Sequence, residues 1–114
     1  MKKLIYIAGP YTAETREGIA ENIRRAEECG KRVLLAGYVP VIPHTLSRPL
    51  NKHAELKNWQ HLDWMEKFCL PLLARCDAML LMSNWHLSKG ASMEKDYAEK
   101  HGISVIENIQ EPIL

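Results

Sequence analysis

The chain has 114 residues, of which 15 are basic and 14 are acidic, so its formal net charge is +1. This balance favours neither a nucleic acid nor an anionic membrane surface as the partner. With 46% hydrophobic residues, one modest core is expected, and we predict a single domain over residues 1–114. No apolar run approaches the roughly 20 residues that cross a bilayer, so no membrane partner is expected.

The start of the chain and its cysteines indicate the compartment. The charged and apolar first residues resemble a signal peptide, but Gly9-Pro10 interrupts them, which favours a strand followed by a turn. The three cysteines, Cys29, Cys69 and Cys76, are odd in number and lack CxxC spacing. Reduced thiols and a cytoplasmic location are therefore expected.

The first half of the chain alternates between strand and helix patterns. Lys3–Ala8 is β-rich and apolar, and a helical period runs from Thr15 to Leu35, with Thr15 as the N-cap and Gly37 after the end. The inner face of this helix is predicted to hold Ile19, Ile23, Ala26, Gly30, Val33 and Leu34. Residues 38–42 form the next predicted strand, and Pro40 places it at the edge of the sheet.

The second half begins with a long polar segment, residues 43–57, which is predicted to be a functional or mobile loop. Residues 58–75 follow a helical pattern that Pro71 should kink or restart. Strands are predicted at 77–82 and 103–106, flanking a helix over 92–100 that Gly102 ends. The tail, residues 108–114, is left open between disorder, a fifth strand and an arm that docks on a neighbour.

This order of elements predicts an α/β fold with three layers. Strands that alternate with helices form a parallel sheet, here of four to five strands, with helices on both faces. Ligands of such sheets bind beyond the carboxyl ends of the strands, where the strand order switches. The loops that follow the predicted strands carry most of the polar residues that are candidates for ligand binding or catalysis.

The most informative residue is Glu94. Ala91, Glu94 and Ala98 share one helix face, and the two alanines indicate close packing on a sheet, where a carboxylate is unexpected. Burying an unpaired ionised group costs several kcal/mol. Glu94 is therefore either a nucleophile that the helix dipole keeps ionised or one partner of a buried ion pair with an arginine.

Three loops supply the other candidate residues. Ser88 and Gly90 precede the helix that carries Glu94, so they form either an anion site or a plain N-cap. Gly9 permits close approach of a ligand, but its turn is also compatible with simple packing. Each of the other candidates also has more than one possible role: Tyr11 (ligand contact or packed ring), His44 (ligand contact, acid or structural) and Trp85 (floor of a base pocket or cover of the sheet).

No motif calls for a bound cofactor. The chain has no Walker loop and no GxGxxG fingerprint after a strand, and its histidines lack the spacing of a zinc site. We therefore expect neither a metal nor a cofactor.

The motifs taken together resemble the nucleoside 2-deoxyribosyltransferase superfamily, and above all its short branch of uncharacterised bacterial and phage proteins. The resemblance covers Tyr6 to about Val105. It rests on these segments: Tyr6-Ile7-Ala8-Gly9-Pro10-Tyr11, Asn22 with Arg25-Ala26, Gly37 with Pro40-Val41 and Pro43-His44, Cys76-Asp77-Ala78, and Trp85 to Ala91 with Glu94 and Ala98.

The resemblance implies a Rossmann-like, flavodoxin-type sheet and a glutamate nucleophile at the position of Glu94. That carboxylate would attack the anomeric carbon and release the base, as in a retaining glycosidase. Gly9 to Tyr11 would lie against the sugar. The serine six residues before the glutamate, Ser88, and Gly90 match the 5′-monophosphate N-glycosidases, where they hold phosphate, whereas the transferases carry an aspartate at the serine position.

One departure concerns Cys69, which stands where the superfamily usually has an aspartate that orients the sugar or protonates the base. Asp63, Glu66 and His44 are candidate substitutes, whereas Asp77 is interpreted as structural. The resemblance thus implies hydrolysis of a (deoxy)nucleoside 5′-monophosphate by a homodimer or larger oligomer. Base exchange, a non-catalytic nucleotide-binding or sensing domain, and cleavage of NAD remain alternatives.

Overall fold

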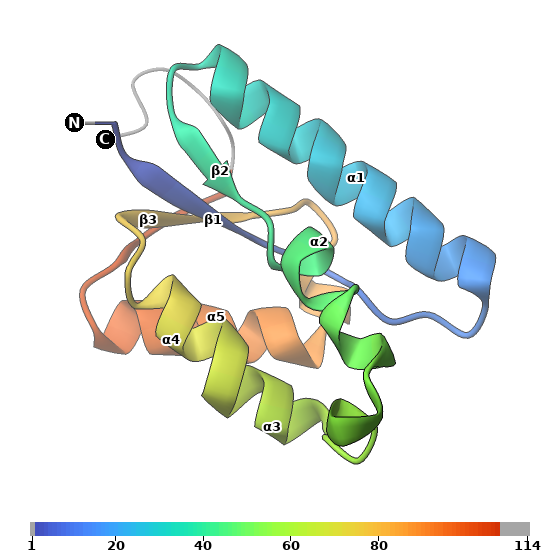
Figure 1. The fold of residues 1–114 in the computed structure, drawn as a ribbon. Helices are drawn as coiled ribbons and strands as arrows, with labels where there is room; N and C mark the ends of the chain where they lie inside the picture. The colour runs from blue at the N-terminus through green and yellow to red at the C-terminus, as the bar shows by residue number, and fades with distance from the viewer. Residues whose placement is uncertain (1, 108–114) are drawn as a thin grey trace.

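A parallel sheet forms the centre of the computed structural model, which describes residues 2–107. Its four strands are β1 (Leu4–Ala8), β2 (Val39–Val41), β3 (Ala78–Leu81) and β4 (Ser104–Ile106), in the spatial order β2-β1-β3-β4. The α/β class and the parallel sheet are thus confirmed, as is the edge position of Pro40 (Figure 1). The prediction for the tail lies outside the described residues.

The strand order switches at β1. The chain leaves β1 toward β2 on one side and later returns to pair β3 on the other side. Neighbouring connections that diverge in this way open a crevice beyond the carboxyl ends of the strands. The turn after β1, the segment after β2 and the loop after β3 all lie at this end (Figure 1).

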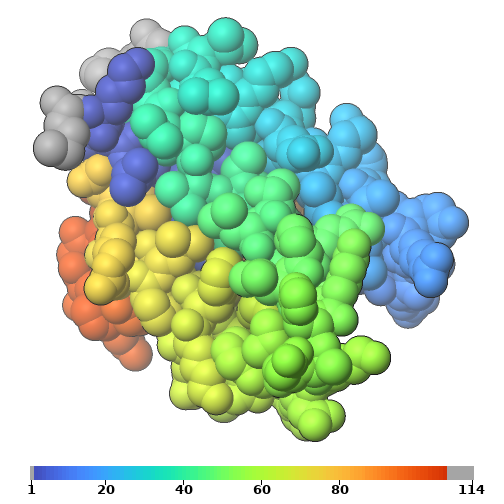
Figure 2. Space-filling view, in the orientation of Figure 1, coloured from blue at the N-terminus to red at the C-terminus, as the bar shows by residue number. Residues whose placement is uncertain are grey.

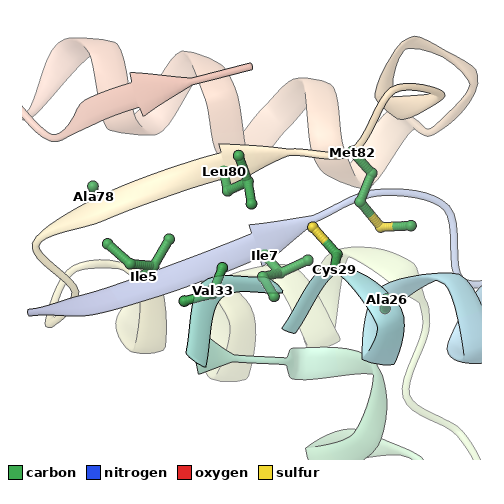
Figure 3. Close-up of a cluster of buried hydrophobic side chains, with 8 residues drawn as sticks. All are labelled: Ile5, Ile7, Ala26, Cys29, Val33, Ala78, Leu80 and Met82. Atoms are coloured by element: carbon green, nitrogen blue, oxygen red, sulfur yellow. The ribbon is translucent and has the colours of Figure 1, made fainter. Parts of the chain in front are cut away.

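Helix α1 (Arg16–Leu35) covers one face of the sheet. Thr15 caps it as predicted, because its hydroxyl accepts a hydrogen bond of 3.0 Å from the amide of Gly18. Gly37, with φ of +96°, supports the turn that ends it. The cluster beneath α1 is entirely apolar (Figure 3) and consists of Ile5, Ile7, Ala26, Cys29, Val33, Ala78, Leu80 and Met82.

The opposite face is covered by α5 (Lys89–Lys100) and by the helical segment between residues 61 and 73 (Figure 1). Its buried cluster includes Leu73, Met79 and Leu81, with Ala91 and Ala98 letting α5 pack closely. Side chains alternate along β1, so Tyr6 and Ala8 point into this second cluster while Ile5 and Ile7 point into the first.

Two details of the predicted secondary structure are wrong. Leu34 is 59% exposed, because one residue beyond buried Val33 the helix has turned it away from the sheet. The predicted loop over residues 43–57 also contains regular structure: α2 (Pro43–Ser47) and two short 3₁₀ turns, η1 (Leu50–Lys52) and η2 (Ala54–Leu56). Proline suits the first turn of a helix, where its missing N–H costs nothing, and α2 begins at Pro43.

The helix predicted over residues 58–75 is divided into three parts. They are α3 (His61–Trp64), the π-helical segment η3 (Met65–Cys69) and α4 (Leu70–Leu73). Pro71 lies in the first turn of α4, in agreement with the predicted restart of the helix. The wide π turn fits the missing N–H of Pro71, and such turns often accompany functional sites. Within residues 2–107, no helix is long and apolar enough to cross a membrane.

Candidate functional site

A cavity of about 330 Å³ lies beyond the carboxyl ends of the strands. The segments after β1, β2 and β3 meet there with α3 and η3, and Figure 2 shows the green segment after β2 on this side of the molecule. The wall is formed by Gly9, Tyr11, Thr12, Pro43, His44, Ser47, Asn51, His61, Trp64, Met65, Cys69, Ser88, Gly90, Ala91 and Glu94. Six of the seven predicted site residues are therefore brought together.

Glu94 occupies the inner part of this wall and is only 5% exposed. The Tyr6 hydroxyl, which projects from β1 toward α5, donates a hydrogen bond to Glu94 Oε2. Among residues 2–107 the ion pairs all involve other carboxylates, so the alternative of an arginine partner is not found. A buried carboxylate held by one neutral donor and facing a cavity is available to a ligand.

Burial controls the charge of Glu94. It raises the pKa of the carboxyl to about 7, although the hydrogen bond from Tyr6 partly opposes this rise. The helix dipole is expected to favour the ionised form of Glu94, and burial acts in the opposite direction. Burial, and then the Glu94 charge, raise the pKa of Tyr6 well above its ordinary value, so Tyr6 remains a hydrogen-bond donor.

Cys69 lies in the same wall, close to both Tyr6 and Glu94. Burial and the neighbouring Glu94 charge raise the pKa of its thiol to about 11, so the thiol is neutral near pH 7. The candidate substitutes on the same segment lie elsewhere. Asp63 accepts a hydrogen bond from the amide of Gln60 and pairs with Lys67, while Glu66 is exposed and outside the cavity wall.

His44 is fixed at the start of α2 and is 4% exposed. Its Nε2 donates to the carbonyl of Pro10 over 2.9 Å, which leaves Nδ1 buried without a hydrogen-bond partner among the described residues. Burial lowers the pKa of the ring, against the opposing effect of the Pro10 and Gly9 carbonyls. The ring is thus neutral near pH 7, which makes it a poor acid but a good acceptor.

The turn after β1 is held from two sides. The Asn22 amide donates to the carbonyls of Tyr11 and Thr12 over 3.1 and 3.3 Å, and Asn51 Nδ2 lies 3.2 Å from the Tyr11 hydroxyl. A Cβ on Gly9 would lie 2.4 Å from Met82 Sδ, so a side chain there would force Met82 to move. The turn therefore presents Tyr11 in a fixed position at the cavity.

Ser88 performs the predicted role of N-cap, because its Oγ accepts from the amide of Ala91 over 3.1 Å. It also lines the cavity, so the cap and an anion site are compatible at this position. Trp85, by contrast, is not in the cavity wall. It packs against the cluster on the α5 face, with Lys95 Nζ 5.6 Å from its ring, and covers the sheet.

Two residues near the cavity are absent from the predicted site. Tyr6 belongs to a predicted strand, and strict alternation of side chains along β1 places it on the face of α5. No local sequence pattern identifies His61 as a site residue, because it approaches Gly90 from a different segment of the chain. Within the described residues, no group of three His, Cys, Asp or Glu side chains could hold a metal ion.

Comparison with known proteins gives the family and a structural neighbour. Residues 3–108 match a family model described as a domain of unknown function, DUF7768, and the chain belongs to that family. No curated protein matches. The fold is similar to a 2-deoxyribosyltransferase from the psychrotolerant bacterium Bacillus psychrosaccharolyticus, with a TM-score of 0.66, 16% identity, and coverage of 95% of this chain and 77% of that one.

Proposed function

We propose that this member of the DUF7768 family is an N-glycosidase that cleaves the base–sugar bond of a (deoxy)nucleoside 5′-monophosphate, with Glu94 as the nucleophile. The observation that carries the proposal is the placement of Glu94. It is a buried carboxylate that faces a cavity, without a cationic partner among the described residues, about one helical turn beyond Gly90. Similarity of fold to a deoxyribosyltransferase supports chemistry at a glycosidic bond.

In the first step, ionised Glu94 attacks the anomeric carbon of the sugar. A bond forms between a carboxylate oxygen and that carbon while the carbon–nitrogen bond to the base breaks, and the electron pair leaves with the base. Tyr6 continues to donate to the other carboxylate oxygen and keeps the group oriented. The leaving base takes a proton from water, because Cys69 and His44 are both poor acids here.

In the second step, water attacks the anomeric carbon of the glycosyl ester. The carbon–oxygen bond to Glu94 breaks, the carboxylate is restored, and the sugar phosphate leaves with a hydroxyl group on that carbon. The proton lost by the water passes to the leaving carboxylate or to solvent. Because burial raises the pKa of Glu94 to about 7, we expect the free enzyme to become more active as pH rises through 7.

The phosphate end of the substrate is assigned to Ser88 and Gly90. The first amides of α5 have no intrahelical acceptor, and the helix dipole favours an anion at this end. Gly90 and Glu94 are separated by four residues, or about 6 Å of helix. This separation suits a pentose that carries its phosphate at one end and its anomeric carbon at the other.

Two observations support alternative functions. The structural neighbour is a transferase, so a second base in place of water would give base exchange. The neutral thiol of Cys69, where a carboxylate is usual in the superfamily that the sequence resembles, would suit a domain that binds nucleotides without turnover.

The test is a panel of ribo- and deoxyribonucleoside 5′-monophosphates, the matching nucleosides and NAD, with free base measured by chromatography. We expect base release from at least one monophosphate, faster than from the matching nucleoside. New nucleotide formed after addition of an acceptor base would assign the transferase reaction. Thermal stabilisation by a monophosphate without base release would overturn the glycosidase and assign a binding domain.

A further inference from the structure

His61, the first residue of α3, lines the cavity beside Gly90. We propose that His61 binds the 5′-phosphate together with Ser88 and thereby selects phosphorylated substrates, an inference that rests on the proposed function above. His61 lies 27 positions before Ser88 in the chain, and both line the same cavity. Neither the capping role of Ser88 nor the chemistry assigned to Glu94 requires a histidine at this place.

The geometry around Gly90 brings the two side chains together. A Cβ built on Gly90 would lie 3.2 Å from His61 Nε2 and 3.7 Å from Ser88 Oγ. The imidazole nitrogen and the hydroxyl thus approach one point directly above the first turn of α5. Met65 Sδ would lie 3.4 Å from the same Cβ, so glycine at position 90 is what allows His61 to approach the backbone this closely. A phosphate oxygen in the adjoining cavity can accept from the ring N–H, the hydroxyl and a free amide.

His61 has hydrogen-bonding capacity to spare. Among residues 2–107, its ring nitrogens make no hydrogen bond and no ion pair, and the side chain is exposed and lines the cavity. Ser88 Oγ accepts from Ala91, so its own hydrogen is free to be donated. Two unused donors that face one position at a helix N-terminus match the acceptor oxygens of a phosphate.

The backbone that carries His61 is held firmly. The carboxylate of Asp63 accepts from the amide of Gln60 over 2.9 Å and fixes the first turn of α3. The ring of Trp64 packs edge-on against Trp59 and Phe68, with centroids 5.1 and 5.9 Å away. The ring of His61 therefore approaches Gly90 from a supported position, as a specificity-determining contact requires.

Charge supports an anion at this end of the cavity and opposes one at the other end. Glu94 lies at the inner end, where a second negative charge would be repelled. Lys89 follows Ser88 directly and is exposed. A phosphate at His61 and Ser88 therefore places the sugar, and not the phosphate, against the nucleophile.

The experiment measures binding of 2-deoxyribose 5-phosphate and ribose 5-phosphate by titration calorimetry, so that no base and no turnover is needed. We expect His61→Ala to weaken binding of the sugar phosphate that wild type prefers by roughly tenfold, the usual effect of losing a hydrogen bond to a charged group. His61→Gln, which retains an N–H donor, should recover part of the loss. His53→Ala, an exposed histidine outside the cavity wall, is the matched control and should leave binding unchanged.

Base release separates this inference from the proposed function. With wild type active, His61→Ala should raise KM for the monophosphate and leave kcat/KM for the matching nucleoside unchanged. Equal losses on both substrates would overturn a phosphate contact and assign His61 to the chemical step. Unchanged binding of sugar phosphates by His61→Ala, or no binding by wild type, would also overturn the inference, whereas failure of wild type to release any base would contradict the glycosidase alone.

Discussion

The two faces of the sheet carry buried clusters of very different chemistry. Under α1, every member of the buried cluster is apolar, as Ile5, Ile7 and Val33 illustrate (Figure 3). Under α5, the buried residues include Tyr6 and Glu94, which share a hydrogen bond at the edge of a cavity. Adjacent residues of one strand therefore serve different purposes: Ile7 stabilises the fold, and Tyr6 supports the site.

The two faces also differ in the free-energy cost of burying their side chains. Burial of an ionisable carboxyl disfavours its charged form, and the rise of the Glu94 pKa to about 7 expresses that cost. An apolar residue at position 94 would pack against the sheet without this cost. The comparison between the faces thus predicts that changes under α5 affect activity and pH dependence, whereas changes under α1 affect stability.

The largest expected effect is on activity. Glu94→Gln keeps the size of the side chain and a hydrogen-bond acceptor for Tyr6 but removes the nucleophile, so base release should fall by roughly 10³-fold or more. Glu99→Gln, an exposed position on the same helix, is the control and should retain activity. Turnover that survives in Glu94→Gln at the wild-type rate would remove Glu94 from the mechanism.

The next effect is on stability and belongs to the other face. Ile7 is fully buried under α1, so Ile7→Ala should lower the free energy of unfolding by about 2–5 kcal/mol. Urea denaturation measures this change, and kcat of the folded protein should stay close to wild type. Leu35→Ala, at a position that is 79% exposed, should change stability by no more than about 0.5 kcal/mol. Equal effects of the two substitutions would contradict the described core.

A smaller effect links the site to the pH dependence of stability. The folded pKa of Glu94, about 7, lies above its ordinary value of 4.5, so the folded state binds more protons between these values and loses stability as pH rises through 7. Glu94→Gln removes this loss. It should be more stable than wild type at pH 8.5 by on the order of 1–3 kcal/mol, with the advantage gone near pH 4.

Thermal or urea unfolding of both proteins across this pH range measures the difference. Glu99→Gln again serves as the control, because its carboxylate is exposed. A gap between Glu94→Gln and wild type that stays constant from pH 4 to 8.5 would show that burial does not perturb the Glu94 carboxyl.

The smallest effect concerns Tyr6. Its hydrogen bond lowers the pKa of Glu94 relative to burial alone, so Tyr6→Phe should raise that pKa further, by about one unit. The acid limb of the kcat/KM profile should move to higher pH by the same amount. Tyr97→Phe, on α5 beside His101, should leave the profile unchanged. An acid limb that moves to lower pH in Tyr6→Phe would contradict the role of the hydroxyl.

Local patterns in the sequence were enough for the fold and for part of the site. Apolar periodicity, the cap at Thr15 and the turn at Gly37 define elements that the structure confirms, and helical spacing places Glu94 on the buried face of α5. The raised pKa of Glu94 was not predicted, because it depends on how completely tertiary packing removes water from the carboxyl. The approach of His61 to Gly90 depends on the path of 27 intervening residues, which no local pattern encodes.

The central claim is that Glu94 forms a covalent bond with the sugar, and the stereochemistry of the product tests it most directly. With methanol as the acceptor, a β-nucleoside 5′-monophosphate should give the methyl β-glycoside, because two displacements at the anomeric carbon retain its configuration. Proton NMR of the product reads the configuration before it can change. The methyl α-glycoside would show a single displacement by the acceptor and would contradict Glu94 as the nucleophile.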